Sequence, residues 1–128
     1  MKRLRVVEEI PKLVSAECGS LTLQYPAISN RGHHAIKRVL GTVPIEEDGS
    51  VAFNAPPGTA LHFQLLDEQY RALQTMRSFV GLMPGERRGC LGCHESHSRA
   101  PEPQTRTLAL MKEPRAIEPG STVFLASP

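Results

Sequence analysis

The residues with the clearest chemistry in this 128-residue sequence are Cys90-Leu91-Gly92-Cys93-His94, in which two cysteines precede a histidine. This Cys-x-x-Cys-His spacing is the attachment pattern of a c-type haem. Each thiol can form a thioether with one vinyl group of the porphyrin, and the adjacent imidazole can bind the iron as an axial ligand. We therefore predict one covalent haem c, held by Cys90 and Cys93, with His94 as the proximal iron ligand.

The sequence offers several candidates for the ligand on the distal side of the iron. His33 and His34 form a remote pair beside a glycine, and either imidazole is suited to bind iron. Met83 precedes Pro84-Gly85, and a thioether ligand would raise the reduction potential. An iron with no sixth protein ligand would favour ligand binding over simple electron transfer.

A zinc site is the main alternative to haem. Cys90 and Cys93 would form half of a tetrahedral site, which His94 or His97 and the remote Cys18 would complete. Zinc sites usually contain a second close pair of ligands, and Cys18 stands alone, so the spacing favours haem. If haem is bound, His97 and Cys18 are candidates for a separate zinc site or for contact with the side chain of the iron ligand His94. A thioredoxin-like redox pair would need a βαβ setting, which the surrounding sequence lacks.

Two arginines that precede the motif are candidates for binding the haem propionates. These are Arg77, in Met-Arg-Ser, and Arg87, which stands three positions before Cys90. Guanidinium groups pair with carboxylates through two parallel hydrogen bonds. The alternative for each is a solvated surface charge.

Composition excludes several functional classes. The formal net charge is +2 with both signs interspersed, so no nucleic-acid partner is expected. No apolar run approaches the roughly 18 residues of a membrane span. The N-terminus is too polar for a signal peptide. Covalent haem attachment follows export, so we expect a periplasmic or otherwise exported protein whose leader was removed, or a domain excised from a longer chain.

Turn signals separate short apolar runs along the first ninety residues. This spacing predicts a mainly β fold, an antiparallel β-sandwich with a c-type haem attached after the last strand. The expected strands span residues 4–10, 36–45, 51–53, 61–65 and 71–80. Asp48-Gly49 predicts a hairpin turn leading into the strand at 51–53, and His62 is expected at the solvent side of its strand. We expect a domain at 1–99 and a Pro-rich extended arm or linker at 100–128.

Several phrases occur in a characteristic order, namely LGTVPIEEDGS (40–50), APPGT (55–59), FQLLD (63–67), LQTMRS (73–78) and PGERR (84–88). Together with the motif, they resemble the haem-bearing domain of the hydrazine synthase alpha subunit and of related planctomycete-type multidomain c-type cytochromes. The resemblance covers about residues 36–97 and implies a β-sandwich with a c-type haem inside a longer chain. In hydrazine synthase the motif histidine can bind zinc, and a tyrosine shortly after the motif binds the iron. Residues 95–99 here contain no tyrosine.

These observations favour a monohaem c-type cytochrome domain for electron transfer, within a larger multidomain protein or complex. Its expected partners are a redox protein or further cytochrome domains, and the sequence is compatible with an oligomer. The alternative is a catalytic or ligand-sensing haem domain with an open iron site that acts on a small nitrogen species. The second alternative is a zinc-binding structural domain. No phosphate-binding loop or Ser-His-Asp signature is present. The electron-transfer interpretation favours a non-enzymatic role.

Overall fold

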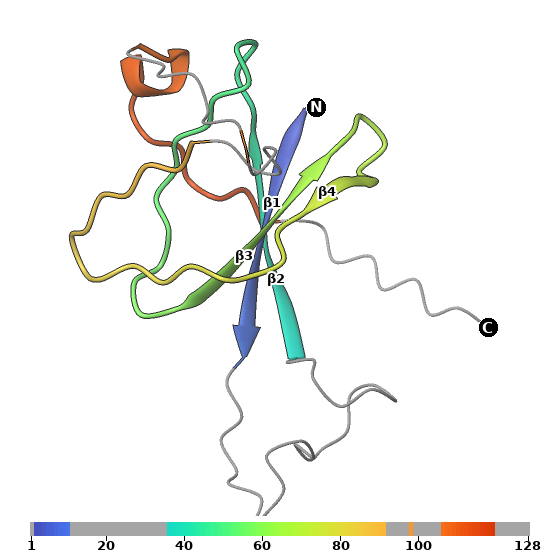
Figure 1. The fold of residues 1–128 in the computed structure, drawn as a ribbon, viewed down its shortest axis with the longest axis vertical. Coiled ribbons are helices and arrows are strands. Elements are labelled where there is room, and N and C mark those ends of the chain that lie inside the picture. The colour runs from blue at the N-terminus through green and yellow to red at the C-terminus, as the bar shows by residue number, and fades with distance from the viewer. Residues whose placement is uncertain (1, 11–35, 92–97, 99–105, 120–128) are drawn as a thin grey trace, which may run out of the picture.

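A four-stranded antiparallel sheet organises the part of the protein that the structure describes (Figure 1). The computed structural model describes residues 2–10, 36–91, 98 and 106–119. Their elements are β1 (Arg3–Ile10), β2 (Ile36–Pro44), β3 (Ala60–Leu66), β4 (Ala72–Thr75) and the 3-10 helix η1 (Leu108–Met111). The strands lie in the order β2-β1-β3-β4, and each pair is antiparallel. The prediction of a mainly β, antiparallel fold is confirmed.

β1 is an inner strand because its sequence suits burial on both sides of the sheet. Its valines are β-branched and fit the pleated backbone. Val6 lies opposite Gly41 of β2 and Phe63 of β3. Val6, Val43 and Leu61 are fully buried and form the core cluster. Alternate residues of the strands therefore supply the hydrophobic core.

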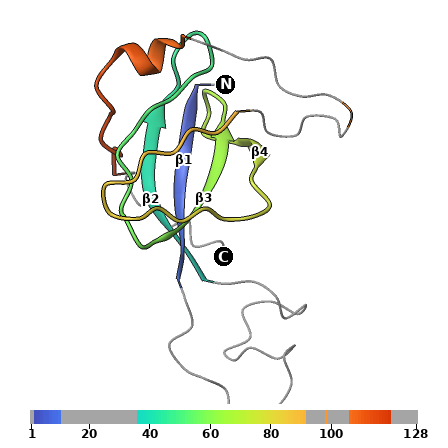
Figure 2. The same cartoon turned by 60° about the vertical axis from the view of Figure 1, so that its left-hand side comes forward.

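The layer that covers this cluster consists of irregular chain in the part that the structure describes (Figure 2). Apolar side chains from residues 51–55 and 80–82 pack against the core. Phe53 meets Phe63 edge to face, with ring centroids 5.8 Å apart. Val80 pairs with Leu61 through reciprocal backbone hydrogen bonds of 2.8 and 2.9 Å. The segment that leads to the motif is thereby tied to β3.

Two of the expected strands differ from the structure. The turn at Asp48-Gly49 is confirmed, with Gly49 at φ 84°, but Phe53 makes only an isolated bridge. The reason is that β1 occupies one edge of β2 and Glu118 bonds to the other edge, so residues 51–53 cross the sheet face instead. The strand expected at 71–80 is shorter, and only Ala72–Thr75 belongs to β4.

His62 is buried, which corrects the expectation that it faces solvent. Its exposed fraction is 4%, and that of Val7, opposite it on β1, is also 4%. The Nδ1 atom of His62 lies 3.4 Å from the carbonyl oxygen of Ser78. The chain after β4 therefore covers this side of the strand and gives the imidazole a polar neighbour. Alternation of polar and apolar residues within β3 could not reveal a covering segment from further along the chain.

Candidate functional site

The approach to the Cys-x-x-Cys-His motif is a fixed turn. Gly85 adopts φ 74°, and the Glu86 N–H donates to the carbonyl oxygen of Met83 at 3.0 Å. The Glu86 carboxylate accepts from the Met83 N–H at 2.7 Å and from the Arg88 guanidinium at 2.6 Å. These contacts, the Met83 N–H first, lower the pKa of Glu86 below its ordinary value. These bonds thus fix the conformation of residues 83–88, immediately before the motif.

Cys90 follows this turn as an exposed, free thiol. A Cβ atom added at the preceding Gly89 would meet no atom within 4 Å. Thioether formation requires a reduced, accessible cysteine, and Cys90 is free and exposed. The other predicted ligands lie outside the described residues, namely Cys18, His33, His34, Cys93, His94 and His97.

The predicted propionate ligands are exposed and available. In the described ranges neither Arg77 nor Arg87 forms an ion pair, whereas Arg88 is held by Glu86. The Met83 side chain is 71% exposed. Met83, Arg87 and Cys90 all lie in the segment 83–90, which contains the turn. Arg77 lies shortly after the end of β4. No hydrogen bond joins these four side chains in the described structure, and all four are exposed.

The described ranges contain no cluster of metal-ligating side chains. Within 2–10, 36–91, 98 and 106–119, no three His, Cys, Asp or Glu side chains lie where they could hold one ion. The zinc alternative therefore depends on residues beyond these ranges. Among the described residues, no helix is long and apolar enough to cross a membrane.

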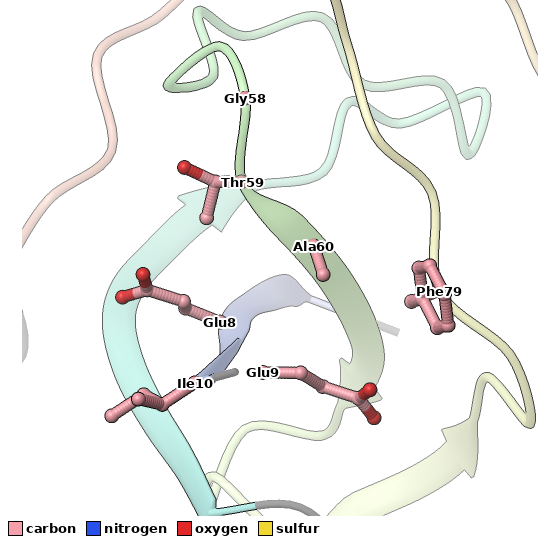
Figure 3. Close-up of a pocket in the computed structure, with 7 residues that line it drawn as sticks. All are labelled: Glu8, Glu9, Ile10, Gly58, Thr59, Ala60 and Phe79. Carbon is pink, nitrogen blue, oxygen red and sulfur yellow. The ribbon is translucent and has the colours of Figure 1, made fainter. Parts of the chain in front are cut away.

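A hollow of about 450 Å³ lies where β1 ends, beside the start of β3 (Figure 3). Glu8 and Glu9 are its acidic lining residues, and Figure 3 shows their carboxylates turned in opposite directions. Arg38 pairs with Glu8 at 2.5 Å, and Lys37 pairs with Glu9 at 3.1 Å. Both carboxylates are therefore neutralised from within the sheet, and neither of these acids, the two that line the hollow among the described residues, is unpaired.

Sequence reasoning missed the polar side chains of the turn at residues 46–50. Glu46, Asp48 and Ser50 are hydrogen-bonded to residues about sixty positions further along the chain. The sequence carried one local signal, because an Asp side chain in a turn often accepts a hydrogen bond from the backbone N–H two residues further on. No local signal identified the distant partner.

These turn carboxylates predict acid sensitivity. Hydrogen bonds from Lys112 and Arg115 hold the pKa of Glu46 below its ordinary 4.5, and the Ser50 hydroxyl holds the pKa of Asp48 below 3.8. A carboxylate with a lowered folded pKa stabilises the fold above its unfolded pKa, and this contribution disappears as the pH falls through the folded pKa. We expect the melting temperature to change little above pH 4.5 and to fall below it. Thermal unfolding across this range checks this, and a melting temperature unchanged in acid would contradict it.

Fold and site together define a mainly β domain in which the turn at residues 83–86 shortly precedes a Cys-x-x-Cys-His motif. The family model described as "Hydrazine synthase alpha subunit middle domain" matches residues 1–95 of the chain. The chain belongs to this family, and the resemblance seen in the ordered phrases is confirmed. The match runs through the whole motif and ends one residue after His94. Neither the curated proteins nor the solved structures contain a match to the chain.

Proposed function

We propose that this chain is a monohaem c-type cytochrome domain that transfers electrons within a larger protein or complex. The observation that carries the proposal is the exposed, unpaired thiol of Cys90 at the start of a Cys-x-x-Cys-His motif. Membership of the hydrazine synthase alpha family supports it, since the matched region extends over that motif. Because covalent attachment follows export, the proposal includes a periplasmic or otherwise exported location.

Each candidate residue would have a distinct role in binding the haem. Cys90 and Cys93 would hold the porphyrin through thioether bonds, and His94 would bind the iron from the proximal side. The exposed guanidinium groups of Arg77 and Arg87 would pair with the propionates. When bound, the haem supplies a one-electron redox couple.

The distal ligand decides between the proposal and a second candidate function. The exposed thioether of Met83 is available for this position, and His33 or His34 is the alternative. If no side chain binds there, the domain would be a catalytic or sensing haem site for a small nitrogen species. The name of the matched family, which refers to a synthase, favours this second candidate.

Optical spectra of the purified protein, oxidised and reduced, test the proposal. Electron transfer predicts a c-type reduced spectrum and a low-spin oxidised iron with His or Met as sixth ligand. A high-spin spectrum that changes on addition of nitric oxide would overturn electron transfer in favour of the second candidate. A protein that carries zinc and no haem would overturn both in favour of a structural metal domain.

A further inference from the structure

The chain beyond the motif returns to the sheet. Residues 106–119, called here the return segment, run from η1 to the outer edge of β2 (Figures 1 and 2). The N–H groups of Thr42 and Glu118 each donate to the other residue's carbonyl oxygen at 2.9 Å. The Arg115 N–H donates to the carbonyl oxygen of Ala52 at 3.0 Å. The return segment is therefore bonded through its backbone to the domain at two places.

Apolar contacts also fix the return segment. Ala109 in η1 is 5% exposed, and Ile117 packs against the core cluster. Gly41 of β2 leaves the space that this packing needs. A Cβ atom at Gly41 would overlap the carbonyl oxygen of Glu118 and lie 2.7 Å from Cγ2 of Ile117. The close approach of Glu118 to β2 thus requires a glycine at this position.

The turn at residues 46–50 supplies the polar contacts with η1. The Asp48 carboxylate accepts a hydrogen bond from the Leu108 N–H at 2.7 Å. The Ser50 hydroxyl oxygen accepts one from the Ala109 N–H at 3.0 Å and donates to Asp48 at 2.6 Å. N–H groups in the first turn of a helix have no partner within the helix. This turn satisfies two of them and so fixes where η1 begins.

Glu46, at the base of the same turn, holds the part of the return segment that follows η1. Lys112 Nζ donates to one carboxylate oxygen at 2.5 Å, and the Arg115 guanidinium donates to the other at 3.1 Å. The Glu46 side chain is 13% exposed, so its carboxylate is partly shielded from water, whereas the Lys112 and Arg115 side chains are about half exposed. Both carboxylate oxygens of Glu46 and one of the two of Asp48 therefore accept hydrogen bonds from the return segment.

We propose that Glu46 and Asp48 are positioning residues for the motif, because they anchor the chain on its C-terminal side through the return segment. The turn held by Glu86 anchors the chain on the N-terminal side. The motif would then lie between two anchored segments of the same domain. That domain would extend through residue 119, beyond the end of the family match at residue 95. The role toward haem rests on the proposed function. The anchoring itself does not.

Limited trypsin digestion of the haem-free full chain tests the anchoring. The double substitution Glu46→Ala with Asp48→Ala should speed cleavage after Arg106 and Lys112 at least about tenfold, because proteolysis follows local opening. Asp67→Ala is the matched control. Asp67 makes equivalent bonds to the Gln69 N–H at 2.8 Å and the Arg71 N–H at 2.9 Å, and none of its hydrogen bonds reaches the return segment in the described structure. Equal cleavage rates in the double variant and in the Asp67→Ala control would overturn the anchoring.

The haem-loaded protein tests positioning. The double variant should shift the reduction potential or the spin state, and the Asp67→Ala control should not. The single variant Asp48→Asn keeps Glu46 and one acceptor oxygen for the Leu108 N–H, so it should retain the wild-type value. Faster cleavage with unchanged haem properties would retain the anchoring and overturn the positioning role. If the wild-type chain binds no haem, the positioning role fails together with the proposed function, and the digestion alone decides the anchoring.

Discussion

Replacing Gly41 with alanine is expected to lower the melting temperature by roughly 10 °C or more. The new methyl group would overlap the carbonyl oxygen of Glu118, and the residue would keep a φ of 151° that disfavours a side chain. Overpacking and backbone strain each cost about 1–3 kcal/mol. About 1 kcal/mol corresponds to a few degrees in a domain of this size. Thermal unfolding followed by circular dichroism measures the change.

Gly89→Ala is the matched control for this substitution. A Cβ at Gly89 meets no atom within 4 Å, and its backbone does not require a positive φ. Its melting temperature should stay close to that of the wild type. If Gly41→Ala unfolds at the same temperature as Gly89→Ala, Glu118 does not pack on β2 as described.

The double substitution Cys90→Ser with Cys93→Ser is expected to abolish covalent haem completely. A hydroxyl group does not form the thioether that the vinyl groups require, so any haem that still binds through His94 would be removed by acid–acetone extraction. The measurement is the pyridine haemochrome assay on the extracted protein, which should give one haem per wild-type chain and none per variant chain.

Cys18→Ser is the control that separates haem from zinc. Covalent attachment needs only the two motif cysteines, so this variant should keep its haem after extraction. A zinc site completed by Cys18 would instead lose its metal in the variant. Zinc loss without any haem signal would contradict the prediction.

The sequence predicted those parts of the fold that depend on local patterns. The strands at 4–10, 36–45 and 61–65 correspond closely to β1, β2 and β3, because short apolar runs bounded by turn residues or proline indicate strands, and the apolar residues of 61–65 alternate. The turn at Asp48-Gly49 likewise follows from the φ that glycine allows. What failed was pairing over long distances. The burial of His62 and the crossing of 51–53 depend on segments that lie far away in the sequence.

The same distinction applies to the candidate site. The motif, Arg77, Arg87 and Met83 could be named from residue type and spacing, and the described members are exposed, as a binding role requires. The contacts of residues 106–119 with β2 and with the turn at 46–50 could not be named from the sequence, because no local pattern encodes partners that lie so far apart in the chain.

The mass of the intact chain tests the central claim most directly. The full chain would be exported and matured in cells that attach haem c, extracted with acid–acetone and measured under denaturing conditions. We expect the mass of the polypeptide plus one haem, with a c-type pyridine haemochrome spectrum. The mass of the bare polypeptide, from cells in which a control c-type cytochrome is fully matured, would contradict covalent haem at Cys90 and Cys93.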